Sequence, residues 1–405
     1  MPKTAPLGLA EPMLPLPIAE PQAVGLSPAG LARLTGRLRS DIARGYLPGA
    51  VALIARRGRI AYFESLGALD PGKGTPMPAD AIFRIYSMTK PIVSVAVMML
   101  VEDGLVLVND PLPKFLPEFA GMKVAVEQGG KVELVPAVRD ITIQDLLRHT
   151  SGLAYEFRGT GPVQQMYLEA KTARREQSNA DQAATLARLP LMHQPGTRWE
   201  YSRSTDVLGR LVEVISGRSL GEFLTERILA PLGMADTGFF APASQHHRLA
   251  EPFAIDPDSG AAVRLLDVKT KPTFESGGGG MVSTAADYAR YCQMMLDGGA
   301  RAGVRLLSRK TVEYMTADHL GPVTGSPDLL QPGYGFGLGF SVRVHAGMAP
   351  YLGSIGQYYW GGLAGTTFWI DPKEELFAVM MIQGPGQRDY VRGVFRNLVY
   401  AAFAD

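Results

Sequence analysis

The chain has 405 residues, of which 46% are hydrophobic and 20% are charged, enough to bury the core of one large domain or of two lobes. This composition excludes a disordered, collagen-like or coiled-coil chain. Forty basic side chains against 39 acidic ones leave a formal net charge of +1. Binding a phosphate backbone requires a basic excess, so we expect no nucleic-acid partner.

The N-terminal residues 1–24 are dense in proline, which disfavours a central strand or a helix interior, and we expect an extended arm packed on the surface. The longest strongly apolar run, residues 91–101, is too short to cross about 30 Å of hydrocarbon, so we expect no membrane span. The lone Cys292 cannot form an internal disulfide, and prolines interrupt the apolar stretch that a signal peptide needs. Both observations favour a cytoplasmic protein.

The two ends of the chain have the patterns of a sheet. A first helix is predicted to begin with Ser27 as its N-cap and Pro28 as its first residue. Two β-rich runs then flank an Arg-Arg-Gly turn within residues 49–67, which predicts a hairpin. Near the other end, strands are predicted within residues 334–344, 361–370 and 375–382, followed by an amphipathic helix over residues 388–403.

Helical patterns dominate the middle of the chain, within residues 91–104, 142–152, 179–190, 204–217, 220–233 and 285–299. Residues 171–177 are interpreted as a solvated helix face. Strand-rich ends that pair around a helical middle predict a mixed α/β (α+β) fold, with one sheet flanked by helices and an all-α lobe. We expect the sheet lobe to comprise residues 25–86 and 285–405 and the helical lobe residues 87–284. The active site is expected between the lobes.

A Gly-x-Ser-x-Gly pattern at residues 217–221 is interpreted as structural. A nucleophile elbow needs a strand before its serine, whereas a helical pattern precedes this one. Gly217 stands where a helix C-terminal glycine belongs, and Ser219 with Glu222 forms a capping box for the next helix.

The sequence gives no support for a metal or another cofactor. Its six histidines form no His-Glu-x-x-His motif and have no paired cysteines. The glycine-rich run at residues 276–281 lacks the Lys-Ser/Thr ending of a phosphate-binding loop and is interpreted as a close-packed turn, with Ser283 or Thr284 capping the next helix.

Ser87-Met88-Thr89-Lys90 is a stronger candidate for chemistry. The helix that follows is apolar on every side, which indicates burial. Residues three apart share a helix face, so the amine of Lys90 can reach the hydroxyl of Ser87. A serine hydroxyl becomes a good nucleophile when a neighbour takes its proton, and burial or nearby charge can lower the pKa of a lysine enough for that task.

The Ser-Met-Thr-Lys motif resembles the nucleophile motif of the serine β-lactamase and penicillin-binding protein superfamily. Residues 141–153 resemble the segment that follows it in class C β-lactamases, residues 199–217 resemble the second motif with Tyr201 in the tyrosine position, and residues 275–291 resemble the glycine-rich turn. These matches occur in the family's order and cover most of the chain. The resemblance implies a β-lactamase-like fold with an antiparallel sheet.

Two departures from the lactamase pattern bear on the substrate. Where β-lactamases carry Lys-Thr-Gly, this chain has Trp360-Gly361-Gly362, which resembles the Trp-x-Gly form of family VIII carboxylesterases. An indole in place of the cation favours a neutral, apolar ester. Arg203 stands where lactamases have the asparagine of Tyr-x-Asn, which disfavours efficient β-lactam hydrolysis.

The resemblance implies an acyl-enzyme on Ser87, with Lys90 and Tyr201 sharing the proton transfers. A cation beside a phenol is expected to lower the pKa of the phenol, and the base is left unassigned between the two groups. The resemblance places the oxyanion donors at the backbone N–H groups of Ser87 and Leu363. Trp360, Gly361, Gly362 and Tyr155 are expected to line the substrate pocket.

The expected function is hydrolysis of short-chain carboxylic esters, with a small-molecule ester as the partner and no metal or cofactor. A β-lactamase, a D-amino-acid amidase or peptidase, and an acyltransferase are the alternatives within the same fold. They differ in the fate of the acyl group. A non-catalytic binding module is disfavoured because Ser87, Lys90 and Tyr201 are all retained. Formation of a homo-oligomer is left open.

Overall fold

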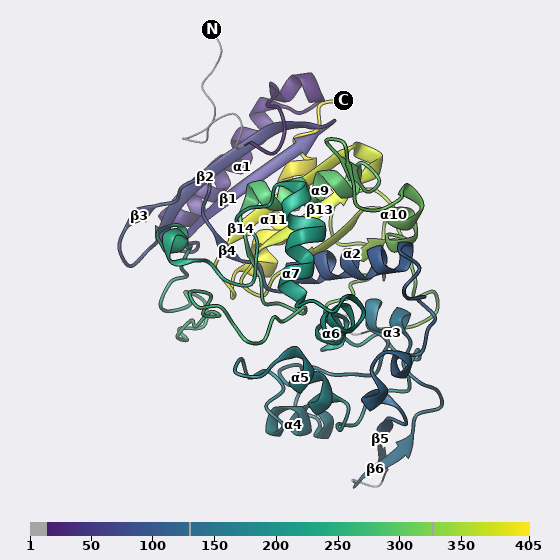
Figure 1. Ribbon diagram of the computed structural model, residues 1–405. Helices are drawn as coiled ribbons and strands as arrows, with labels where there is room; N and C mark the ends of the chain where they lie inside the picture. The colour runs from purple at the N-terminus through teal and green to yellow at the C-terminus, as the bar shows by residue number, and fades with distance from the viewer. Residues whose placement is uncertain (1–13, 129–130, 326–327) are drawn as a thin grey trace.

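A large antiparallel sheet forms the centre of the molecule (Figure 1). The computed structural model describes residues 14–128, 131–325 and 328–405. Within these ranges the strands of the main sheet lie in the order β10-β11-β12-β13-β14-β1-β2-β3, and every neighbouring pair is antiparallel. The predicted fold class, an antiparallel sheet flanked by helices, is confirmed.

Strands from the two ends of the chain meet in the middle of this sheet. β1 pairs with β14 so that Ala50 lies opposite Ile382, and β1 also forms the predicted hairpin with β2. The strands of the main sheet are β1 (Gly49–Arg56), β2 (Arg59–Asp70), β3 (Thr75–Pro76), β10 (Tyr334–Phe336), β11 (Ser341–Arg343), β12 (Tyr358–Gly361), β13 (Thr367–Asp371) and β14 (Leu376–Ile382).

The sheet is covered on both faces because apolar residues occupy both sides of its central strands. Along β1, Val51 and Leu53 belong to one core cluster and Ala52 and Ile54 to another. The second cluster includes residues of α1 (Pro28–Ala43) and α11 (Arg388–Tyr400), and the first includes residues of α2 (Thr89–Glu102) and α9 (Ala285–Leu296). The terminal helices α1 and α11 therefore pack on one face, and helices from the middle of the chain pack on the other.

The remaining helices lie between α2 and the late strands in sequence. Figure 1 shows that α4, α5 and the β5–β6 hairpin lie far from α1 and the N-terminal strands, at the other end of the molecule. The helices are α3 (Ile143–Leu147), α4 (Pro162–Glu169), α5 (Asn179–Leu186), α6 (Ser204–Ser216), α7 (Leu220–Leu224), α8 (Ala230–Leu232) and α10 (Arg309–Met315). The short strands outside the main sheet are β4 (Phe83–Arg84), β5 (Lys123–Gln128), β6 (Lys131–Pro136), β7 (Val282–Ser283), β8 (Ala300–Arg301) and β9 (Val304–Arg305). The expected lobe boundaries at residues 86 and 284 stay predictions.

Three local features differ from expectation or refine it. Residues 171–177 are turns between α4 and α5, so the interpretation as a helix face was wrong. Lys171 has a φ of 52°, which ends the preceding helix. Residues 1–13 of the predicted arm lie outside the described residues, while residues 14–16 are bends, Ile18 forms an isolated bridge with Ile60 and residues 21–24 form a 3-10 turn. In the described part of the chain, no helix combines the length and apolar character needed to cross a membrane.

The predicted helix ends are confirmed where they concern the Gly-x-Ser-x-Gly pattern. Gly217 follows α6 with a φ of 71°, and Ser219 is the N-cap of α7 in a complete capping box with Glu222. Ser27 caps α1 and Thr284 caps α9 in the same way, through a side-chain oxygen that accepts a backbone N–H. Ser219 thus stabilises a helix start.

Replacing Ser219 with alanine is expected to lower the free energy of unfolding by about 1 kcal/mol, because the N–H of Glu222 loses its side-chain acceptor. Urea unfolding followed by circular dichroism measures this change. The Ser219→Thr variant, which keeps the hydroxyl, is the matched control and should retain most of the stability. Equal losses for the two variants would contradict the capping role.

Candidate active site

Ser87 lies in a one-turn 3-10 segment, Tyr86–Met88, directly before the buried helix α2. The preceding Tyr86 has a φ of 43°, a left-handed conformation that costs a non-glycine residue free energy. The Tyr86 hydroxyl accepts a hydrogen bond from the N–H of Leu266 at 2.8 Å, which helps to hold this turn. The Ser87 side chain is partly exposed, at the wall of a cavity.

Lys90 lies one turn into the helix, and its amine is the centre of a polar cluster. The Nζ atom is 3.2 Å from Ser87 Oγ, 3.0 Å from the Tyr155 hydroxyl and 2.6 Å from the carbonyl oxygen of Gly278. The side chain is only 1% exposed. Burial lowers the pKa of Lys90 to about 7, with Asp206 raising it and Arg203 lowering it. At neutral pH a substantial fraction of this amine is therefore free to accept a proton.

Tyr201 comes from the segment before α6 and reaches the same cluster. Lys90 Nζ lies 4.4 Å from the centre of its ring, and the indole N–H of Trp360 donates to its hydroxyl at 3.1 Å. Burial raises the pKa of Tyr201, while the Ser87 hydroxyl and the Trp360 indole act in the opposite direction. The expectation of a lowered phenol pKa was therefore wrong, because burial disfavours the charged phenolate.

The Trp360-Gly361-Gly362 segment ends β12 and turns toward β13. A Cβ on Gly362 would lie 2.3 Å from Thr366 Oγ1 and 2.4 Å from the carbonyl oxygen of Ile85, so the turn packs directly against the chain leading to Ser87. Leu363 is 46% exposed at the cavity wall. Within the described part of the chain, its backbone N–H has no hydrogen-bond acceptor.

A cavity of about 890 Å³ connects these groups. Its wall includes the predicted residues Ser87, Tyr155, Tyr201, Trp360, Gly362 and Leu363. Gly361 also lines it, so the structure brings the predicted site residues together at one place, with Lys90 just beneath the wall. Tyr155 does more than line this space, because its hydroxyl hydrogen-bonds with the Lys90 amine.

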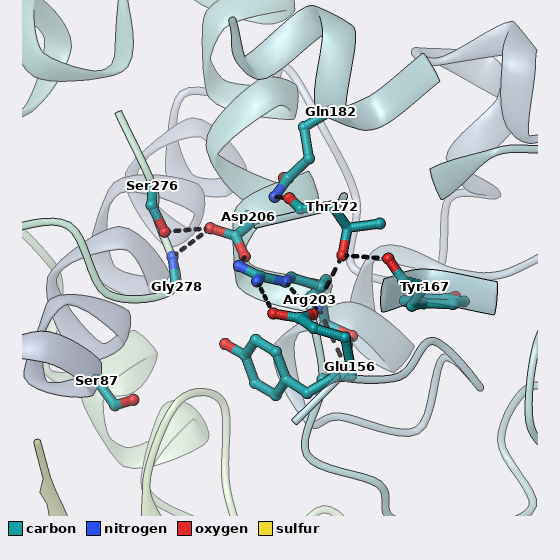
Figure 2. A network of polar contacts seen from close by, with 12 residues as sticks. Ser87, Glu156, Tyr167, Thr172, Gln182, Arg203, Asp206, Ser276 and Gly278 are labelled. Atoms are coloured by element: carbon teal, nitrogen blue, oxygen red, sulfur yellow. Dashed lines mark hydrogen bonds and ion pairs between the residues drawn. The ribbon is translucent and has the colours of Figure 1, made fainter. Parts of the chain in front are cut away.

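The sequence did not predict the buried ionic network next to the site, which Figure 2 shows. Arg203 donates to Glu156 at 2.5 Å and to Asp206 at 3.2 Å, and all three side chains are largely buried. Asp206 in turn accepts the N–H of Gly278 at 2.9 Å, and the carbonyl of Gly278 faces Lys90. The arginine that replaces the expected asparagine thus binds two carboxylates and has no contact with the amine. The one signal in the sequence was the acidic residue three positions after Arg203 on a helical pattern.

A buried histidine, His149, packs against the ring of Tyr201. The ring of His149 lies 4.9 Å from that of Tyr201, and its Nδ1 is 3.3 Å from Ser202 Oγ. Burial and the neighbouring Lys90 lower the pKa of His149 well below the usual value, so this ring is neutral and packs as an aromatic side chain. Among the described residues, no cluster of histidine, cysteine or carboxylate groups could hold a metal ion.

The reactivity of Ser87 should follow the protonation of Lys90. Labelling by a serine-directed fluorophosphonate is expected to accelerate as the pH rises through about 7, because only the neutral amine can accept the hydroxyl proton. The rate constant measured across this range gives the apparent pKa. Lys90→Arg should abolish labelling, since a guanidinium does not lose its proton.

The Asp206→Asn variant tests the electrostatic part of that account. Removing this negative charge is expected to shift the acid limb to lower pH, because Asp206 raises the pKa of Lys90. Asp181→Asn, at an exposed N-terminal position of α5, is the control and should leave the limb in place. A shift to higher pH in Asp206→Asn would contradict the assignment.

The close packing of the Gly362 turn predicts a second effect. Gly362→Ala is expected to reduce Ser87 labelling by about tenfold or more, because a displaced turn withdraws a backbone donor from the site. The overpacking should also lower the free energy of unfolding by about 1–3 kcal/mol. Stopped-flow labelling and urea unfolding measure the two effects. Gly347→Ala, where a Cβ meets no atom, is the control.

Comparisons with known proteins bear on the family and the fold of this chain. The Beta-lactamase family matches residues 34–402. Protein Rv1367c of Mycobacterium tuberculosis is 37% identical over 84% of this chain and 86% of its own length, and Esterase EstB of Burkholderia gladioli is 32% identical over 87% and 90%. The structure of EstCE1, described as a hydrolase with promiscuous acyltransferase activity, superposes with a TM-score of 0.77 at 25% identity, covering 92% of this chain and 98% of its own.

The family match spans most of the chain, and the antiparallel sheet flanked by helices is the fold that the resemblance implied. The chain belongs to the Beta-lactamase family.

Proposed function

We propose that the protein is a serine carboxylesterase that hydrolyses short-chain carboxylic esters through an acyl-enzyme on Ser87. The observation that carries the proposal is the contact of 3.2 Å between Ser87 Oγ and a buried amine whose pKa is about 7. A relative named as an esterase, 32% identical over most of the chain, supports the ester as the substrate class.

The reaction begins when Ser87 Oγ attacks the ester carbonyl and its proton passes to Lys90 Nζ. The carbonyl oxygen gains negative charge and accepts hydrogen bonds from the backbone N–H groups of Ser87 and Leu363. Collapse of this tetrahedral species breaks the bond to the alcohol oxygen, which leaves with the proton that Lys90 took from Ser87, so the amine is neutral again. The acyl group then remains on Ser87 as an ester.

Hydrolysis repeats these steps with water as the nucleophile. The neutral Lys90 takes a proton from water, the resulting hydroxide attacks the acyl carbonyl, and Ser87 Oγ leaves with a proton from the amine. Tyr201 stays a phenol throughout, since burial raises its pKa, and its hydroxyl is suited to donate to the departing oxygen. We therefore assign the base to Lys90 and a hydrogen-bonding role to Tyr201.

The aromatic wall favours an uncharged acyl group. Trp360 is 5% exposed and packs at 5.2 Å from the ring of Tyr201, so two aromatic rings form part of the cavity wall that Ser87 shares. Arg203 binds Glu156 and Asp206 and cannot replace the amide that lactamases use. This arrangement supports an ester over a β-lactam.

Acyl transfer to an alcohol is the second candidate, and the size of the cavity favours it. A space of about 890 Å³ is much larger than a short acyl chain and leaves room for an acceptor alcohol beside the acyl-enzyme. The promiscuous acyltransferase activity named for EstCE1 agrees with this second candidate.

A cytoplasmic location is also proposed, supported by the single buried Cys292.

The nucleophile is tested by incubating the protein with a series of p-nitrophenyl esters and with the cephalosporin nitrocefin. Mass spectrometry is expected to find the acyl adduct on Ser87, with faster turnover of p-nitrophenyl butyrate than of nitrocefin. Ser87→Ala should abolish turnover, and Ser219→Ala should leave it nearly intact. An inactive Ser219→Ala variant would overturn the assignment of Ser87 as the nucleophile. A strong preference for nitrocefin would overturn the assignment of an ester as the substrate.

A further inference from the structure

One arginine of α11 holds the turn that carries the Leu363 N–H. Arg392 Nη2 donates to the carbonyl oxygen of Gly362 at 2.5 Å and to that of Thr366 at 3.2 Å. The N–H of Gly365 also donates to the Gly362 oxygen, at 3.1 Å. The β12–β13 turn is therefore held from outside its own strands by a charged side chain of the last helix.

The contact matters because of which peptide group it engages. The carbonyl of Gly362 and the N–H of Leu363 belong to the same peptide unit, and in a trans peptide these two groups point in opposite directions. No described peptide bond is cis. A guanidinium bound to the carbonyl therefore directs the Leu363 N–H away from Arg392. It also polarises the peptide, which strengthens the opposite N–H as a donor.

Gly361 makes this approach possible. A Cβ at Gly361 would lie 2.5 Å from Arg392 Nη2, so a side chain there would displace the guanidinium. Burial lowers the pKa of Arg392 to about 10, and the group still carries its charge at neutral pH. Its acidic neighbour, Asp389, is 3.6 Å away and mostly exposed, and leaves Nη2 to the backbone carbonyls.

We propose that Arg392 is a positioning residue of the oxyanion hole, which orients and polarises the Gly362–Leu363 peptide so that its N–H meets the developing charge. The inference rests on the proposed function, since it assigns an origin to one of the two oxyanion donors. It also explains why two successive glycines follow Trp360. Gly361 admits the guanidinium, and Gly362 admits the turn against the chain before Ser87.

Arg392→Met is the direct test, with p-nitrophenyl butyrate as the substrate and butylboronic acid as the analogue of the tetrahedral species. We expect kcat to fall by roughly tenfold or more, a part of the 10²–10³-fold loss that removal of a whole oxyanion donor causes, while KM changes little. The inhibition constant of the boronic acid should rise in parallel with the fall in kcat/KM. Arg392→Lys, which keeps the charge and one donor direction, should recover part of both.

Arg56→Met is the matched control for losing a buried arginine that holds backbone carbonyls. Arg56 donates to the carbonyls of Val24, Gly25 and Glu374 and lies outside the cavity wall. Its loss should lower the melting temperature without changing kcat or the boronic acid constant. If Arg392→Met does not fold, Arg392→Lys is compared with the wild type and should show a several-fold fall in kcat with unchanged KM.

The two proposals fail in different ways. A wild-type protein that neither hydrolyses p-nitrophenyl butyrate nor forms an adduct on Ser87 would overturn the proposed function. An active wild type with an unchanged kcat in folded Arg392→Met would overturn only the role of Arg392. A raised KM with an unchanged kcat would also overturn it, since that result indicates a direct substrate contact.

Discussion

The site depends on the burial of one amine. Lys90 is almost completely removed from water, and its three hydrogen-bond partners are a hydroxyl, a phenol and a carbonyl, none of which carries a negative charge at neutral pH. Burying an ammonium among neutral partners costs free energy, so burial stabilises the neutral amine relative to the charged one and lowers the pKa. The same burial raises the pKa of Tyr201. In the proposed mechanism, this one environment makes Lys90 the proton acceptor and leaves Tyr201 a hydrogen-bond donor.

The charged side chains near this amine form ion pairs with one another. Arg203 lies between Glu156 and Asp206. Asp206 raises the pKa of Lys90, whereas Arg203 lowers it. Asp206 also fixes Gly278, whose carbonyl receives the amine. The same residues therefore balance the charge near the amine and fix the carbonyl that receives it.

The two backbone donors of the proposed oxyanion hole are also held in place by contacts within the fold. The peptide that carries the Leu363 N–H is fixed by strand pairing, by its own turn and by a guanidinium from the terminal helix. The Ser87 side is fixed by the start of α2 and by the left-handed Tyr86. Two segments more than two hundred residues apart are pressed together at Gly362 and Ile85, without room for a methyl group between them. Preorganised donors of this kind act without rearrangement during the reaction.

Much of this protein was determined by the sequence alone. Local periodicity and capping predicted the β1–β2 hairpin, the buried α2, and the structural roles of Gly217 and Ser219, because these features depend on neighbours within a few residues. The serine-lysine spacing gave the contact between Ser87 and Lys90 for the same reason. The motif order gave the family and brought Tyr201 and Trp360 into the candidate site.

The tertiary structure decided the rest, because long-range contacts and desolvation leave little trace in local sequence. The direction of the pKa shift of Tyr201 was wrong at the sequence level, since it depends on how completely the folded core excludes water. The partners of Arg203, the carbonyl of Gly278 at the Lys90 amine and the guanidinium of Arg392 at Gly362 join elements far apart in the chain. Only the folded chain sets those distances, and through them the charge and direction of each group at the site.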